Sequence, residues 1–174
     1  ERPDFWGEFE SPNIAKHTLD REPESKVKHI GAGRVDDVAY AFADFVDLKS
    51  PYAAAHSRRV AKVTEQLAAL MGCSAEDTSL YRNAGLLHDL GVAAVPSAAL
   101  NAGEASQTAA QREQLRLHPY YAERILDRTS ALDALKPLIG GHHERMDGKG
   151  FFRGLSGEAI PLGARLIAVA NRLD

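Results

Sequence analysis

The sequence contains a single cysteine, Cys73, together with one tryptophan and two methionines. One cysteine excludes an internal disulfide and a cysteine-based zinc site. The longest apolar runs, such as residues 166–170, fall far short of the roughly 20 residues that a transmembrane helix needs. The N-terminal region carries no secretory signal pattern. These absences predict a soluble, cytoplasmic protein that does not bind a membrane.

An excess of positive charge is also missing. The 21 lysines and arginines face 24 aspartates and glutamates, which gives a net charge of −3. General nucleic-acid binders carry a basic footprint, so we expect no direct nucleic-acid binding by this fragment. With 44% hydrophobic and 26% charged residues, the composition is that of an ordinary globular protein large enough to bury a sizeable core.

Strand patterns are the third absence, because no stretch of useful length alternates apolar and polar residues. Apolar residues instead recur at helical spacing, first over about 35–48. Caps, prolines and glycines predict where the helices begin and end. The predicted starts are Ser50-Pro51, Ser74, Thr108, Pro119, Ser130 and Pro161, and the predicted stops are Gly72 and Gly91. The sequence therefore predicts the all-α class.

The chain divides by pattern into two parts. Residues 1–34 precede the helical pattern, and we expect an N-terminal arm or short helix there, followed by one domain over 35–174. The aromatic residues of the arm, Phe5, Trp6 and Phe9, could dock on the helical bundle or on a second subunit. The sequence starts without Met and stops within an apolar helical pattern, so we expect a fragment of a longer protein.

Histidines are the informative minority. Five of the seven follow residue 50, and they fall on predicted apolar faces: His56 shares a stripe with Val60, and His142 shares one with Leu138. A lone histidine on such a face is usually a satisfied core residue. Several on different helices, with Asp89 beside them, cost solvation free energy unless something pairs with them. A transition-metal ion is the economical partner for neutral imidazole and carboxylate.

The order of the motifs is specific, although a His-Asp dipeptide alone carries no signal. The motifs are HSRRVA at 56–61, AGLLHDLG at 84–91, HPYYAERIL at 118–126 and HHERMDGKGFFRGLSGEAIPLGARLIAVAN at 142–171. In these motifs the chain resembles the HD-GYP subgroup of the HD-domain metal-dependent phosphohydrolases, over roughly residues 35–174. It is most similar to members that carry VDLKSP, here at 46–51, and that often adjoin a helix-turn-helix output domain in bacterial signalling regulators.

The resemblance implies a fold, a reaction and a cofactor. The fold is a helical bundle of about five core helices plus extra helices, the last of which would be missing after Asp174. The reaction is hydrolysis of cyclic di-GMP or a related phosphodiester by a two-metal site with a bridging hydroxide. The ions are Fe or Mn first, with Zn or Ni as alternatives. The family's metal-ligand positions hold His56, His88, Asp89, His118, His142, His143 and Asn171, with Asp89 as the bridge and His88 beside it as the catalytic pair.

Four departures from the family pattern weaken the resemblance. Asn171 replaces a metal-binding aspartate and removes one negative charge, and Val92 replaces a lysine able to reach a phosphate. The Tyr-Pro of the signature reads Phe151-Phe152, so a hydroxyl is lost but a ring that can stack on a base remains. Tyr52 replaces a glutamate that supports a third metal in some members, so we expect two metals at most.

The glycine-rich loop supplies the predicted substrate contacts. These are Arg145, Lys149, Gly150 and Phe151. Arg145 could instead pair with an acidic neighbour and fix the loop, and Glu144 could hydrogen-bond a ligating imidazole or lie exposed.

Two functions remain open at this point, with a structural alternative beside them. One is a working phosphodiesterase of cyclic di-GMP or a related nucleotide. The other is a catalytically weakened HD-GYP-like module that senses a ligand or binds a protein in a signalling regulator. The structural alternative is a helical domain with incidental histidines. The sequence also leaves open a homodimer and an adjacent output domain.

Overall fold

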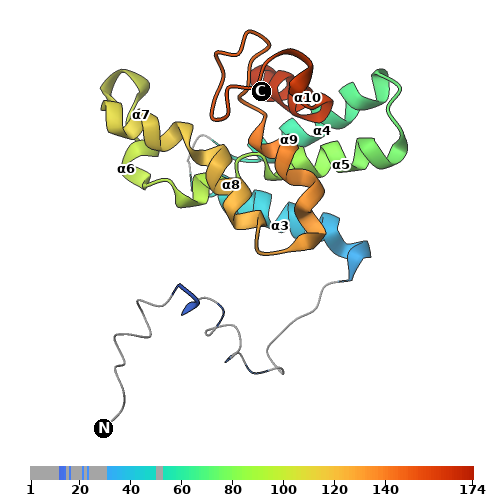
Figure 1. The fold of residues 1–174 in the computed structure, drawn as a ribbon, viewed down its shortest axis with the longest axis horizontal. Coiled ribbons are helices and arrows are strands. Elements are labelled where there is room, and N and C mark those ends of the chain that lie inside the picture. Colours follow the sequence, from blue (N-terminus) through green and yellow to red (C-terminus); the bar gives the residue numbers. More distant parts are fainter. Residues whose placement is uncertain (1–11, 15, 17–20, 22, 24–30, 50–52) are drawn as a thin grey trace. The chain divides into compact units, whose positions relative to one another are not determined.

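A computed structural model describes residues 12–14, 16, 21, 23, 31–49 and 53–174 of the chain. The chain divides into two units, residues 1–31 and 32–174. The second unit carries the helices labelled in Figure 1. The aromatic residues of the predicted arm and the predicted helix start at Ser50-Pro51 lie outside the described residues.

The described residues of the second unit form α-helices and short 3-10 helices (η) and no strand, which confirms the predicted all-α class (Figure 1). In chain order the elements are η2 (Ala32–Arg34), α3 (Val35–Asp47), α4 (His56–Leu70), α5 (Ala75–Leu87), η3 (Leu90–Ala94), α6 (Ser97–Leu100), η4 (Glu104–Ser106), α7 (Ala109–Arg116), α8 (His118–Leu126), η5 (Ser130–Leu135), α9 (Lys136–Gly140), η6 (Gly157–Ala159) and α10 (Leu162–Leu173). In this described part of the chain, every helix falls short of the length and apolarity that crossing a bilayer requires.

Three predicted helix starts are confirmed by local hydrogen bonds or position. The Ser74 hydroxyl accepts the backbone N–H of Asp77 at 3.0 Å, which caps α5. Thr108 and Gln111 form a reciprocal capping box at α7. Pro119 lies in the first turn of α8, where its missing N–H costs nothing.

The predicted start at Pro161 and the predicted stop at Gly72 are also confirmed, but two other predicted boundaries are wrong. Helix α5 ends at Leu87 and not at Gly91, because His88 caps it and Gly91 belongs to the following 3-10 helix. Ser130 does not cap a helix through its side chain; it opens a 3-10 turn that leads into α9. The sequence did not predict these boundaries because the chain changes from α-helix to 3-10 helix at residues whose apolar spacing is still helical.

The start of α4 depends on a residue from the preceding helix. Residue Ala55 has a left-handed backbone (φ 56°), so the regular helix begins only at His56. An alanine there offers no capping oxygen. Instead the buried Asp47 carboxylate accepts the Ser57 backbone N–H at 3.1 Å and the Ser57 hydroxyl at 2.7 Å. Asp47 thus takes the part of an N-cap and fixes the position of His56.

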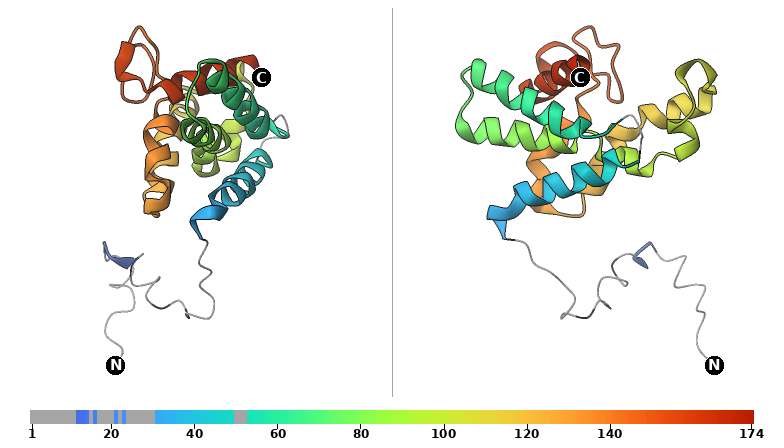
Figure 2. Two further views of the ribbon diagram at one scale, coloured as in Figure 1. Left: turned by 90° about the vertical axis from the view of Figure 1, so that its right-hand side faces the viewer. Right: turned by 180° about the vertical axis from the view of Figure 1, so that it is seen from behind.

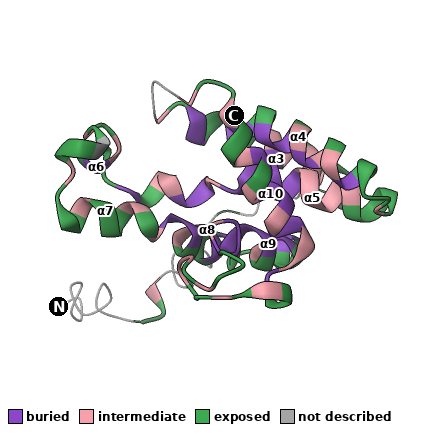
Figure 3. Cartoon of the chain, turned by 90° about the horizontal axis from the view of Figure 1, so that it is seen from above, coloured by how far each residue is buried: buried purple, intermediate pink, exposed green. Residues whose placement is uncertain are grey.

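Buried apolar residues hold together the helices that carry the histidines. Helices α4 and α5 lie side by side in both views of Figure 2, and α10 packs against α4, α5 and α9. Their fully buried side chains include Val60, Leu86, Leu87, Ile139 and Ile167. Each such side chain contributes about 1.5–3 kcal/mol to folding. Figure 3 shows the contrast with α6 and α7, which are mostly exposed.

A close backbone contact brings η3 onto the start of α8. A Cβ atom at Gly91 would lie 1.8 Å from the carbonyl oxygen of His118 and 2.6 Å from the backbone nitrogen of Ala122. Only glycine fits there. This contact places Asp89, two residues earlier, beside the ring of His118.

Candidate metal centre

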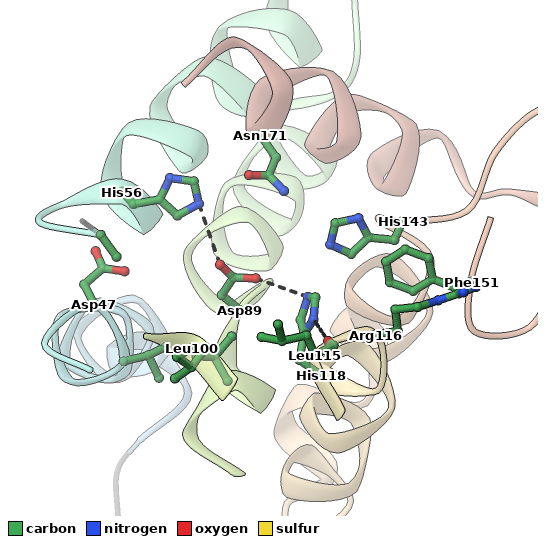
Figure 4. A pocket seen from close by; sticks show the side chains of 13 residues that line it. Asp47, His56, Asp89, Leu100, Leu115, Arg116, His118, His143, Phe151 and Asn171 are labelled. Atoms are coloured by element: carbon green, nitrogen blue, oxygen red, sulfur yellow. Dashed lines mark hydrogen bonds and ion pairs between the residues drawn. The ribbon is translucent and has the colours of Figure 1, made fainter. Parts of the chain in front are cut away.

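The predicted metal ligands come together at one pocket of about 490 Å³. His56, Asp89, His118, His143 and Asn171 line this pocket (Figure 4). The other two, His88 and His142, are buried behind it, with 0% and 1% of their surface exposed. Sequence motifs far apart along the chain therefore converge on one place in the fold.

Each histidine of the buried trio His88, His118 and His142 lies where a helix ends. The Nδ1 atom of each ring lies 2.6–2.8 Å from the backbone carbonyl oxygen three residues earlier, at Gly85, Leu115 and Ile139 respectively. Such carbonyls lack an intrahelical partner at a helix end. A carbonyl only accepts, so Nδ1 carries the proton and the lone pair of the neutral ring is on Nε2. The backbone thus fixes both the orientation and the tautomer of all three rings.

The Asp89 carboxylate lies between the imidazoles. Its Oδ1 is 3.3 Å from His118 Nε2 and 4.0 Å from His142 Nε2. Its Oδ2 is 3.4 Å from His88 Nε2 and 3.7 Å from His56 Nε2. One carboxylate therefore faces two sets of nitrogens, one with each oxygen.

These atoms form two groups that could each hold a metal ion. His56, His88 and Asp89 form the aspartate group, and His118, His142 and His143 form the histidine group. Within each group, one ligand atom per residue lies within 4.8 Å of the others. Nitrogen and carboxylate donors in such numbers suit Fe, Mn, Ni or Zn better than Mg or Ca.

The unpaired nitrogens test whether a metal fits. Buried His88 Nε2 has no hydrogen-bond partner among the described residues. His118 Nε2 and His142 Nε2 face each other at 3.2 Å. Two neutral rings would present two lone pairs there, because both Nδ1 atoms are protonated. A cation that accepts these lone pairs removes both conflicts, so the residues present fit a metal.

Most of the pKa shifts favour the state that a metal requires, which is neutral imidazoles beside a charged carboxylate, and His118 is the exception. Burial lowers the pKa of His88. Burial and the adjacent His143 hold the pKa of His142 well below its usual value, and burial lowers that of His143 to about 3. Burial alone would raise the pKa of Asp89, but the imidazoles of His88 and His118 outweigh it and hold that pKa well below its usual range. Burial opposes protonation of His118, but the adjacent Asp89 carboxylate outweighs it and raises the pKa of that ring.

Asp174, which no motif of the sequence singles out, holds His56. Its Oδ2 lies 2.7 Å from His56 Nδ1, and its carboxylate also takes two bonds from the Arg59 guanidinium. These bonds, that from Arg59 first, lower the pKa of Asp174 to about 2 despite an opposing effect of burial. Asp174 follows Asn171 by three residues, at the C-cap of the last helix, a spacing that places two side chains on the same side of a helix. The three-residue spacing from Asn171, a predicted ligand, is the feature of the sequence that points to Asp174 as part of the site.

The departures from the family pattern lie where their chemistry matters. Asn171 and Val92 both line the pocket, so the loss of an aspartate and of a lysine affects the centre directly. Phe151 stacks on His143, with ring centroids 4.5 Å apart and planes 20° apart. The Phe152 ring packs instead against the Tyr120 ring, with ring centroids 5.7 Å apart. Tyr52, on which the expected absence of a third metal rests, lies outside the described residues.

The glycine-rich loop is held by its own charges. Arg145 makes two bonds to the Asp147 carboxylate, at 3.0 and 2.7 Å, and is exposed. Arg145 and Lys149 border a neighbouring pocket on the far side of His143. A Cβ at Gly150 would lie 2.4 Å from Glu144 Cα, so Gly150 serves close packing of the loop.

Both alternatives for Glu144, a hydrogen bond to a ligating imidazole and an exposed charge, are wrong. Glu144 is buried, and its Oε1 accepts the backbone N–H groups of Arg153 and Gly154 at 2.6 and 3.0 Å. Its other oxygen has no partner among the described residues. The carboxylate therefore closes the loop onto itself.

A second set of pocket residues was missed by the sequence analysis. Val46, Leu100 and Leu115 form an apolar wall, and Arg116 lies at the rim with its guanidinium carbon 5.0 Å from the centre of the Phe151 ring. Leu100, Leu115 and Arg116 lie outside the motifs that carry the resemblance, and Val46 opens the VDLKSP segment without a predicted role. Val46 reaches the pocket from α3. Leu100, Leu115 and Arg116 reach it from α6 and α7 (Figure 4).

Comparisons with known proteins agree with this geometry. The family model described as HD domain matches residues 41–174. The 3'3'-cGAMP-specific phosphodiesterase 3 of Vibrio cholerae is 33% identical over 175 residues, which cover 100% of this chain and 38% of that protein. The cyclic di-GMP phosphodiesterase response regulator RpfG of Xanthomonas campestris is 36% identical over 124 residues, which cover 67% of this chain and 31% of that protein. The chain thus spans less than half the length of these relatives.

A solved structure shares the fold. Bd1817, an HDG"Y"P protein from Bdellovibrio bacteriovorus, aligns with a TM-score of 0.63 at 20% identity and covers 81% of this chain and 51% of its own. Taken with the match to the family model and the relatives, the centre of histidines around Asp89 leads to one conclusion: the chain belongs to the HD-domain family and is of the HD-GYP type.

Proposed function

We propose that this chain is a metal-dependent phosphodiesterase that hydrolyses a cyclic dinucleotide. The observation that carries the proposal is the convergence of imidazole Nε2 atoms on both oxygens of Asp89, with the Nδ1 atoms of His88, His118 and His142 bound to backbone carbonyls. Such preorganised ligands need no rearrangement to accept ions. The relatives are named for cyclic di-GMP and 3'3'-cGAMP, which supports a cyclic dinucleotide as substrate.

Each residue of the centre has a proposed role. The aspartate group and the histidine group would each hold one transition-metal ion, Fe or Mn first and Zn or Ni as alternatives, with Asp89 shared between them and Asn171 as a weaker oxygen ligand. When bound, the ions would polarise a phosphodiester and lower the pKa of a water. Phe151 offers a ring for a base, and the apolar wall excludes water from the bound substrate.

Asp174 and Asp47 act as positioning residues for His56. Asp174 holds the His56 ring through Nδ1, which turns Nε2 toward Asp89. Asp47 fixes the first turn of α4 through Ser57. Carboxylates bound to a ligating imidazole raise its basicity and hold its tautomer.

Metal content and turnover test the proposal together. The purified protein is analysed by plasma mass spectrometry, before and after anaerobic loading with Fe²⁺ or Mn²⁺. The loaded protein is then incubated with cyclic di-GMP and with 3'3'-cGAMP, and the products are separated by chromatography. We expect close to two ions per chain and release of a linear dinucleotide. A protein that takes up no ion after loading would contradict the proposal.

A second function is supported by the residues that the pocket lacks. Val92 places an apolar side chain where the family pattern has a lysine, and Asn171 removes a charge from the centre. Both changes favour a module that binds a cyclic dinucleotide without rapid turnover and passes the signal to an adjacent domain. Binding in a calorimetric titration with negligible product would support this function, whereas rapid turnover at millimolar Mn²⁺ would refute it.

A further inference from the structure

The pocket carries a cation that neither the motifs nor the metal centre use. Of the described residues that line it, Arg116 is the only lysine or arginine. Its guanidinium makes no hydrogen bond or ion pair with a described residue and lies over the Phe151 ring at 5.0 Å. It is exposed at the rim.

Three of the other arginines near the centre already form ion pairs, and a fourth, Arg172, lines the neighbouring pocket and not this one. Arg59 is bound to Asp174, and Arg145 to Asp147. Arg153 is bound to the buried carboxylate of Glu123. Each of these guanidinium groups would have to break an ion pair before it could bind a phosphate. Arg116 would not, because an aromatic face is its one described contact.

The spacing of the rings places Arg116 beside the metal centre but not in it. His143, a proposed ligand, stacks on Phe151, and the Phe151 ring lies between His143 and Arg116 in Figure 4. A phosphodiester held at the centre would therefore face the imidazoles, while Arg116 faces a group about one ring farther along the substrate. A cyclic dinucleotide has two phosphodiester groups, and its second one meets this requirement.

We propose that Arg116 binds the phosphodiester of the cyclic dinucleotide that is not cleaved, and so selects substrates with two phosphates. This inference rests on the proposed function and names a specificity residue for it. A guanidinium is suited to the task because it binds phosphate oxygens in pairs and can remain stacked on an aromatic ring. The apolar wall of Val46, Leu100 and Leu115 would then contact the base and ribose beside that phosphate.

The test compares substrates with two phosphates and one. Arg116→Gln, Arg116→Lys and wild type are loaded with Mn²⁺, and their metal content is measured. Dissociation constants for cyclic di-GMP and 3'3'-cGAMP are measured by equilibrium dialysis, and turnover is measured with both and with bis(p-nitrophenyl) phosphate. Arg128→Gln is the matched control, because Arg128 is an exposed arginine outside the pocket.

We expect Arg116→Gln to raise the dissociation constant and KM for the dinucleotides by about 10- to 100-fold, the value of a lost charge-assisted pair. Metal content, kcat and the KM for bis(p-nitrophenyl) phosphate should change little. Arg116→Lys should recover part of the loss, because lysine retains the charge but not the paired geometry. An unchanged dissociation constant in Arg116→Gln, or an equal rise in Arg128→Gln, would overturn the inference.

Failure of the inference can be told apart from failure of the proposed function. A wild-type protein that binds the dinucleotide without turnover contradicts the phosphodiesterase, and the dissociation constants still decide the role of Arg116. A protein that hydrolyses bis(p-nitrophenyl) phosphate but binds no dinucleotide keeps the phosphodiesterase chemistry and overturns the inference.

Discussion

The two ligand groups of the metal centre differ in whether a ligand depends on a partner far away in the sequence. In the histidine group, the rings of His118 and His142 are fixed by carbonyls of the residues three positions earlier. In the aspartate group, His88 uses the same local device at Gly85, whereas His56 is fixed by the side chain of Asp174, which lies 118 positions away in the sequence. The first device is local and needs only a helix end; the second depends on the packing of α10 against α4. We conclude that the histidine group tolerates change elsewhere better than the aspartate group does.

The largest effect is expected from the residue that the two groups share. Asp89→Asn keeps the size of the side chain but removes the charge that faces all four Nε2 atoms. Both groups should lose their ion, so metal content should fall from about two per chain to near zero. Asp127→Asn, which changes an exposed carboxylate paired with Lys136, is the control and should keep its metal. Full occupancy in Asp89→Asn would show that Asp89 is not a ligand.

Single-ligand variants separate the two groups. His56→Ala and His143→Ala each remove one partly exposed ligand, from the aspartate group and the histidine group respectively, and leave Asp89 in place. Each should retain close to one ion per chain, as measured by plasma mass spectrometry. If either variant lost both ions, the two groups would have to be treated as one coupled cluster, and the comparison between them would fail.

A smaller effect should follow from Asp174→Asn. The amide still accepts a hydrogen bond from His56, but it no longer offers a charge to His56 and Arg59. Metal affinity should fall by about tenfold, through the aspartate group only. Asp44→Asn is a matched control, because Asp44 makes a similar paired contact with Arg58 at 2.6 Å without touching a histidine. Equal affinities for Asp174→Asn and wild type in a competition titration with a chelator would remove Asp174 from the site.

The same distinction explains which parts of the centre could be predicted from sequence. The resemblance placed His88, His118 and His142 among the ligands, and the structure brings these residues together because each follows or opens a helix in a recognisable motif. The all-α class followed from the spacing of apolar residues. These features depend on neighbours within a few positions.

Long-range partners could not be predicted in this way. The cap of α4 by Asp47 crosses a turn, and Arg116 reaches the pocket through the fold of α6 and α7. Glu144 was expected either to hydrogen-bond an imidazole or to lie exposed, but its buried carboxylate accepts hydrogen bonds from backbone N–H groups of the loop. Such contacts depend on tertiary packing, which the spacing of residues within one helix or motif does not predict.

Asn171→Asp offers the finest test of the comparison. Asn171 lines the pocket one turn before Asp174 on α10, so the variant adds a carboxylate on the side of the centre that depends on α10. Metal affinity should rise by about tenfold, or about 1.4 kcal/mol, because the added charge compensates a divalent ion that otherwise faces Asp89 and neutral rings. Gln114→Glu adds the same charge on the exposed face of α7 and should leave the affinity unchanged.

If the gain persists in an Asn171→Asp, His143→Ala double variant, the added charge acts on the aspartate group. A gain that disappears with His143 would instead assign residue 171 to the histidine group and make both groups dependent on α10. No gain at all would show that the amide at residue 171 does not lower the metal affinity of the centre. Asn171 would then no longer support the interpretation of a weakened enzyme.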